Sequence, residues 1–88
     1  MYNNIVKDEI DLHRLTVEEA LPKLDNFLYD AFQAGFYDIR VVHGKGTGTL
    51  RQAVRRELAK HPLVQSYRPG GYGEGGADGV TIVELSSK

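Results

Sequence analysis

The sequence predicts a small two-layer domain of the α/β (α+β) class, in which a mixed four-stranded sheet carries two helices on one face. Two stretches have apolar residues at helical spacing, four short stretches have strand character, and they follow one another in the order βαβαββ. The chain has 88 residues, which is the size of a single domain. We assign residues 9–85 to this domain, with tails at residues 1–8 and 86–88. Two right-handed crossover connections between the strands should place both helices on the same side of the sheet.

The first strand is expected within residues 9–15, where polar and apolar residues alternate. Because side chains of a strand point alternately to its two faces, Ile10 and Leu12 should face the core. Asp11 and His13 should then share the opposite face, near the end of the strand.

The first helix is expected within residues 16–35. Thr16 and Glu19 have the spacing of a capping box, and Gly35 suits the C-terminal end. Pro22 lies beyond the first turn and should bend or loosen the helix, because it lacks a backbone N–H. The apolar stripe of this helix comprises Val17, Ala20, Leu21, Leu24, Phe27, Leu28 and Ala31.

The second half of the chain supplies a strand, a helix and two further strands. Residues 37–43 are rich in β-branched side chains and predict a strand buried on both sides. Residues 50–61 predict the second helix, which Pro62 ends. Residues 63–68 and 80–85 predict a hairpin joined by a glycine-rich loop, and the sheet face away from the helices is expected to be open. The inward side of the second helix comprises Leu50, Ala53, Val54 and Leu58.

Composition narrows the functional classes. The chain has no cysteine, which excludes disulfides, thiolate metal sites and cysteine nucleophiles. No apolar run is long enough to span a membrane, and the N-terminal residues are too polar for a signal peptide, so a cytoplasmic location without membrane contact is expected. Residues 40–60 contain six Lys or Arg and a single Glu, although the net charge is −1. Such a basic block suggests a local contact with a polyanion, whereas a charge run on its own is more typical of a solvated helix face.

The stretch "HGKGTGT" (residues 43–49) stands where the second strand gives way to the second helix. A helix N-terminus binds anions through its unpaired N–H groups and its partial positive charge, and glycines allow close approach of a phosphate. The spacing matches neither a nucleotide P-loop nor a dinucleotide fingerprint, so a nucleic-acid phosphate is the preferred ligand. The candidate phosphate-binding residues are Gly44, Lys45, Gly46, Thr47, Gly48, Arg51 and Arg55.

Asp11 and His13 form a second candidate group, because a carboxylate can orient an imidazole for proton transfer. If the first two strands are parallel neighbours, His13 and His43 both end near the glycine turn. Taken alone, Asp-x-His on a strand is more typical of a polar surface, and it gains weight through the expected convergence with the glycine turn. Asp11, His13 and His43 could also supply two imidazoles and a carboxylate to a metal, which ranks below metal-free proton transfer.

Two further groups complete the candidates. His61 lies at a helix C-terminus and is interpreted as structural. Tyr67, Arg68 and Tyr72 flank the glycine-rich loop and could stack on unpaired bases, although Tyr67 is as typical of core or rim packing.

Three segments together resemble the Smr (small MutS-related) domain over residues 9–85, with the greatest similarity to the Smr domain that ends the second class of bacterial MutS proteins. These segments are "DLHRLTVEEAL", "VVHGKGTGTLR" and "HPLVQSYRPGGYGEGGADGVTIVEL". The resemblance implies a fold like the C-terminal domain of translation initiation factor three. It also implies nuclease activity, which is DNA nicking in some members and RNA cleavage in others. Arg14 departs from the family pattern, in which glycine commonly follows Asp-Leu-His.

The resulting hypothesis is an endonuclease acting on DNA or RNA, in DNA repair and recombination or in RNA and ribosome quality control. Asp11, His13 and His43 are the candidate catalytic residues: Asp11 orients His13 as the base, and His43 protonates the leaving oxygen or contacts phosphate. Arg14 adds a phosphate contact. No metal is required, with Mg²⁺ or Mn²⁺ as the alternative.

The rival hypothesis is a DNA- or RNA-binding module without catalysis, belonging to a larger MutS-like protein; a protein-interaction domain is a weaker third option. A stand-alone protein, a terminal domain and an association with the ribosome all stay open.

Overall fold

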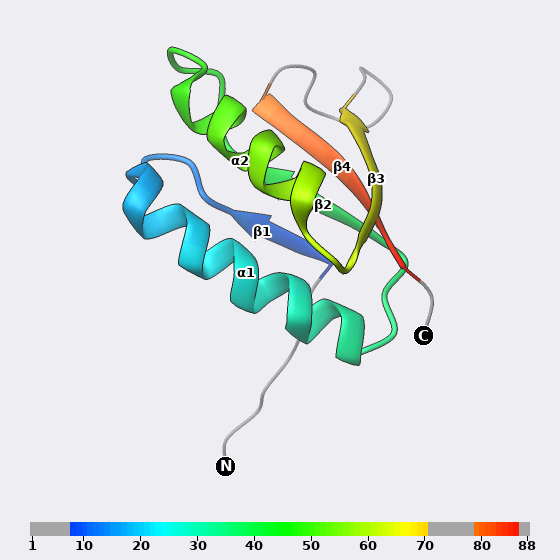
Figure 1. The fold of residues 1–88 in the computed structure, drawn as a ribbon. Helices are drawn as coiled ribbons and strands as arrows, with labels where there is room; N and C mark the ends of the chain where they lie inside the picture. The colour runs from blue at the N-terminus through cyan, green and yellow to red at the C-terminus, as the bar shows by residue number, and fades with distance from the viewer. Residues whose placement is uncertain (1–7, 71–78, 87–88) are drawn as a thin grey trace.

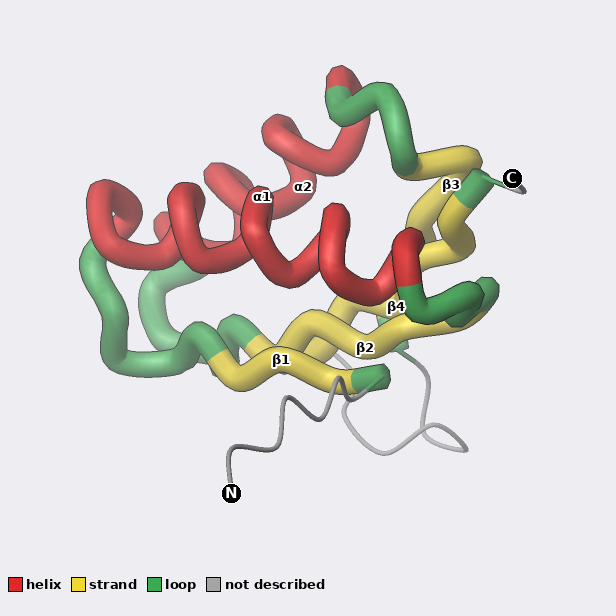
Figure 2. Tube along the Cα trace, turned by 90° about the horizontal axis from the view of Figure 1, so that it is seen from below, coloured by secondary structure: helices red, strands yellow, loops and turns green. Residues whose placement is uncertain are grey.

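The computed structural model describes residues 8–70 and 79–86, and it has a helical layer packed on one face of a sheet (Figures 1 and 2). The elements are β1 (Glu9–Asp11), α1 (Val17–Gln33), β2 (Asp38–Val42), α2 (Thr49–Lys60), β3 (Val64–Pro69) and β4 (Val80–Leu85). The predicted βαβαββ order and the two-layer arrangement are therefore confirmed. Among the described residues, no helix has the length and apolar character needed to cross a bilayer.

The sheet has the strand order β1-β2-β4-β3, so the last strand in the sequence lies inside the sheet. β1 runs parallel to β2, with Asp11 opposite Val42. β4 is antiparallel to both of its neighbours, β2 and β3. The parallel pairing places the carboxyl ends of β1 and β2 side by side, as the expected convergence of the two polar motifs requires.

The core lies between the sheet and the two helices. The buried cluster comprises Leu12, Ala20, Leu24, Leu28, Ala31, Ile39, Val41, Val54, Leu58, Val83 and Leu85. The prediction that the second strand is buried on both sides is wrong, because Arg40 and Val42 remain partly exposed on the face without helices. Continuous burial belongs instead to β4, whose residues 80–83 are all buried between two neighbouring strands.

The helices begin and end close to the predicted positions. In α1 the Thr16 hydroxyl accepts the backbone N–H of Glu19 at 3.1 Å, and the Glu19 carboxylate accepts the backbone N–H of Thr16 at 3.0 Å. This capping box was predicted, as was the stop at Gly35, which has a φ of +86°. Pro22 does not interrupt the helix, which runs from Val17 to Gln33.

The antiparallel pairing of β3 with β4 confirms the predicted hairpin. β4 spans the predicted residues 80–85. Residues 71–78, which form most of the glycine-rich loop and include Tyr72, lie outside the described residues.

Candidate functional site

Asp11 and His13 interact directly at the end of β1. The Asp11 carboxylate accepts the backbone N–H of His13 at 3.0 Å, and the same carboxylate oxygen contacts His13 Nδ1. The hydrogen bond from the His13 side chain lowers the pKa of Asp11, and the bond from the His13 backbone N–H adds to this effect. Asp11 therefore stays ionised at neutral pH and favours a proton on Nδ1. The opposite nitrogen, Nε2, then has a free lone pair.

The structure brings this pair against the glycine turn. The Leu12 N–H donates to the Val42 carbonyl at 2.7 Å, which joins the ends of β1 and β2. A Cβ atom added to Gly44 would lie 3.2 Å from His13 Cβ, closer than most real contacts, and Gly44 has a φ of +79°. Both the short distance and the positive φ favour glycine at residue 44. His13 can therefore lie this close to the turn because glycine has no side chain.

The turn leads into α2 through backbone that glycine adopts readily. Gly46 and Gly48 have φ angles of +37° and +89°, and Gly48 is the N-cap residue. Gly48 provides no side-chain cap, and the first turn of α2 contains no acidic residue. The Thr47 hydroxyl lies 3.4 Å from the Thr49 nitrogen, which is a long hydrogen bond. The start of α2 is therefore a set of backbone donors with positive partial charge, available to an anion.

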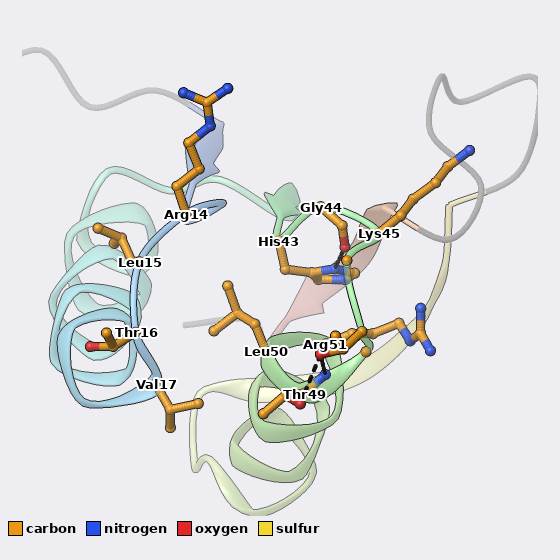
Figure 3. Close-up of a pocket in the computed structure, with 13 residues that line it drawn as sticks. Arg14, Leu15, Thr16, Val17, His43, Gly44, Lys45, Thr49, Leu50 and Arg51 are labelled. Atoms are coloured by element: carbon orange, nitrogen blue, oxygen red, sulfur yellow. Dashed lines mark hydrogen bonds between the residues drawn. The ribbon is translucent and has the colours of Figure 1, made fainter.

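The buried side chain of His43 supports the glycine turn from inside the protein. Its Nδ1–H donates to the Gly44 carbonyl at 3.0 Å, and its Nε2 accepts the hydroxyl of Thr81 at 2.8 Å (the first of these bonds is drawn in Figure 3). Thr81 in turn accepts the Nε–H of Arg55 at 3.1 Å. Burial lowers the pKa of His43, and the cations of Arg55 and Arg51 lower it further, against the opposite effect of the Gly44 hydrogen bond.

These contacts suit His43 to a positioning role better than to the proton donation that the sequence suggested. The ring is neutral, and both of its nitrogens are engaged within the protein. Thr81 was not among the predicted residues. The available signal was a threonine in an apolar strand, because a buried hydroxyl requires a hydrogen-bond partner.

The turn is also fixed to the start of β4. The backbone N–H groups of His43 and Gly44 both donate to the Gly79 carbonyl, each at 3.0 Å. Two donors on one acceptor hold the beginning of the turn in place, while residues 45–47 are exposed to solvent.

A hollow of about 280 Å³ lies between the N-terminal ends of α1 and α2. It is lined by Arg14, Leu15, Thr16 and Val17 on one side and by residues 43–51 on the other. Figure 3 shows the side chains of Arg14, Lys45 and Arg51 extending away from its centre. The predicted phosphate-binding residues, apart from Arg55, therefore all line the same hollow. Arg55 bonds to Thr81 instead.

Arg14 has a φ of +72° and is the one non-glycine residue with a positive φ in the described part of the chain. This left-handed conformation is unfavourable for a residue with a Cβ atom. It explains why glycine suits this position, and it places a cation beside the hollow.

His61 has the structural role predicted for it. It donates from Nε2 to Asp25 at 2.8 Å and accepts the N–H of Leu63 at 3.1 Å, which ties the end of α2 to α1. Among the described residues, no group of three or more His, Asp or Glu side chains is arranged as a metal-binding set. The set of Asp11, His13 and His43 is thus not assembled, since both nitrogens of His43 are engaged elsewhere. Tyr67 is exposed on β3, with 37% of its surface accessible.

Comparison with known proteins gives a consistent result. Residues 10–86 match the family model of the Smr domain. The chain is 54% identical over 80 residues to Endonuclease MutS2 of Clostridium beijerinckii, which covers 91% of this chain and 10% of that relative. It is 56% identical over 77 residues to Endonuclease MutS2 of Symbiobacterium thermophilum, covering 88% and 10%. The chain thus spans about a tenth of the length of these curated relatives.

Solved structures show the same fold. The Smr domain of Thermus thermophilus MutS2 has a TM-score of 0.86 and 45% identity, covering 91% of this chain and 99% of that one. YdaL, a stand-alone small MutS-related protein from Escherichia coli, has a TM-score of 0.83 and 28% identity, covering 92% of this chain and 65% of that one.

Proposed function

Since this chain belongs to the Smr domain family, we propose that it is a nucleic-acid endonuclease in which Asp11 and His13 act on a phosphodiester held by residues 44–48. The observation that carries the proposal is the approach of His13 to Gly44, where an added Cβ would lie 3.2 Å from His13 Cβ. A histidine whose Cβ lies this close to an anion-binding turn can bring its ring to the same phosphate.

In the proposed reaction, Nε2 of His13 takes a proton from the attacking oxygen. That oxygen belongs to water for DNA, or to the neighbouring ribose 2′-hydroxyl for RNA. The new P–O bond forms as the bond to the leaving oxygen breaks, and the leaving oxygen takes a proton from solvent. Asp11 stabilises the imidazolium that forms on His13. The N–H groups at the start of α2, with Lys45 and Arg51, stabilise the negative charge on the phosphoryl oxygens.

One observation favours the alternative of a binding module without catalysis. The relatives named as endonucleases are about ten times longer than this chain, so their activity can reside in another part. In this alternative the same turn and cations bind DNA or RNA for a larger MutS-like protein, and Asp11 and His13 form part of the polar rim.

The test is cleavage of end-labelled single-stranded RNA and supercoiled plasmid, in EDTA and then in Mg²⁺ or Mn²⁺. We expect His13→Ala to lower the rate by roughly 100-fold or more, with Kd changed less than threefold, because a general base contributes about 10²–10⁴-fold to rate. Asp11→Asn should also lower the rate, whereas Asp30→Asn, an exposed change on α1, should not. Tight binding without cleavage under every condition would support the binding module instead. The substrate that is cut decides between DNA and RNA.

A further inference from the structure

We infer that the hollow between the starts of α1 and α2 is a subsite for one unpaired nucleobase, so that the domain selects single-stranded or locally opened nucleic acid. This inference rests on the proposed function and adds the class of substrate to it. The subsite lies beside the phosphate turn, because the two share residues 43–51.

The walls of the hollow are apolar where a base would lie. Leu15 and Val17 contribute from the α1 side and Leu50 from the α2 side (Figure 3). All three are only partly buried, although Leu15 and Leu50 also pack against the core. Apolar side-chain atoms in the hollow are therefore accessible to a ligand, next to positively charged groups and hydroxyls. Extruded bases are commonly held between apolar or aromatic side chains in this way.

The size of the hollow favours a single base. Its volume of about 280 Å³ lies just below the range of roughly 300–1,000 Å³ typical of small-molecule sites. One planar ring system fits this space, whereas a base pair or a complete dinucleotide cofactor is too large.

Charge gives the orientation of the bound nucleotide. Arg14, Lys45 and Arg51 are among the lining residues, and no Asp or Glu is. The phosphate is therefore expected at the rim, on the open start of α2, with its base directed between Leu50 and Val17. A base in a duplex is paired and stacked and must be extruded before it can enter, which costs free energy. Selection for unpaired strands follows from this cost.

Short oligonucleotides of equal charge test the inference. An octamer of thymidylate and an octamer of abasic residues carry the same phosphates and differ in whether bases are present. Fluorescence anisotropy should show that the native chain binds the thymidylate octamer roughly tenfold more tightly, or more, because stacking of a base contributes strongly to affinity. Equal affinity for the two octamers would overturn the inference.

A variant that fills the hollow locates the effect. Val17→Trp should bind both octamers with the affinity that the native chain has for the abasic one. The matched control is Asn26→Trp, an exposed position on α1 that does not line the hollow, and it should keep the native preference. If Val17→Trp keeps the preference, the base binds elsewhere and the inference fails. Circular dichroism melts check folding, and Val17→Phe is a smaller filler if the Trp variant unfolds.

The outcomes also separate this inference from the proposed function. If the native chain cleaves nucleic acid but does not prefer the thymidylate octamer, the inference of a base subsite is overturned and the proposed nuclease function stands. Absence of binding to every nucleic acid tested removes both.

Discussion

The two helices start on opposite sides of the same hollow, and their starts are built in opposite ways. At α1, Thr16 and Glu19 satisfy each other's backbone N–H groups, and two acidic residues lie in the first turn. At α2, Gly48 offers no side-chain cap and the first turn has no acidic residue. The third helical position makes the contrast plain, since it is Glu19 in α1 and Arg51 in α2.

The two helix starts differ in whether their backbone donors contribute to stability or stay available to a ligand. A capped start contributes to folding and has few donors left for a ligand. An uncapped start with a neighbouring cation forgoes that contribution and keeps its donors for an anion. The phosphate site is therefore expected at α2, although both helices point their positive ends toward the hollow.

Reversing the charge at the start of α2 should produce the largest effect. Arg51→Glu gives α2 the acidic third position of α1, and we expect affinity for a single-stranded oligonucleotide to fall at least tenfold. The slope of log K against log salt should decrease by about one, because one phosphate contact is lost. Titrations at several salt concentrations measure both quantities. Arg56→Glu is the control, because Arg56 is exposed on α2 and does not line the hollow. An equal loss in both variants would show that only net charge matters.

Removing the cap of α1 should reduce the stability of the fold. Thr16→Ala is expected to lower the free energy of unfolding by about 1 kcal/mol, because a backbone donor loses its partner. For a domain of this size that corresponds to a fall in Tm of about 4–8 °C. Thr49→Ala, in the first turn of α2, should cost less than half as much, since Thr49 does not cap a helix. Urea denaturation compares the two, and similar losses would contradict the assignment of the caps.

Left-handed backbone leads into each helix, at Gly44, Gly46 and Gly48 before α2 and at Arg14 before α1. Arg14→Gly should therefore be more stable than Arg14→Ala by about 1 kcal/mol, because alanine retains the unfavourable Cβ atom. Both variants lose the same charge, so their affinities for nucleic acid should fall equally. Thermal melts measure the first expectation and anisotropy the second. Equal stability of the two variants would show that the backbone relaxes.

A smaller effect should appear in the pH dependence of stability, through the histidine that supports the open start of α2. The pKa of His43 is lowered from 6.5 in the folded chain, so below pH 6.5 the unfolded chain binds a proton more readily than the folded one. The free energy of unfolding should then decrease as the pH falls below 6.5, and this contribution should be constant above it. In His43→Gln the decrease should be smaller, because the side chain whose pKa is lowered by folding is absent. Parallel curves from denaturation at pH 5 to 7.5 would contradict the assignment.

The local rules predicted much of this fold. The capping box, the glycine stop and the residues of β4 follow from short-range patterns, and so does the placement of glycines before α2. The burial of β2 was predicted wrongly because a run of β-branched residues looks the same whether one or both faces are covered. Which face of each strand is covered depends on the position of β4 within the sheet, and that pairing joins residues far apart in the sequence.

The candidate site was predictable to the same extent. Motif spacing indicated Asp11, His13 and the glycine turn, and the parallel pairing of β1 and β2 brings them together. Three features depended on tertiary contacts and were not predictable. They are the left-handed backbone of Arg14, the bonds from Thr81 to His43 and Arg55, and the shared Gly79 carbonyl.

The Gly79 carbonyl and the Thr81 hydroxyl have a consequence for the order in which the site is assembled. The glycine turn is complete in the sequence by residue 48, yet its first two N–H groups and its buried histidine are held by residues 79 and 81. A chain emerging from the ribosome therefore has the motifs of the site long before it has their support. The glycine turn gains these contacts only when β4 has been made and has inserted between β2 and β3, so the proposed site is incomplete in the nascent chain.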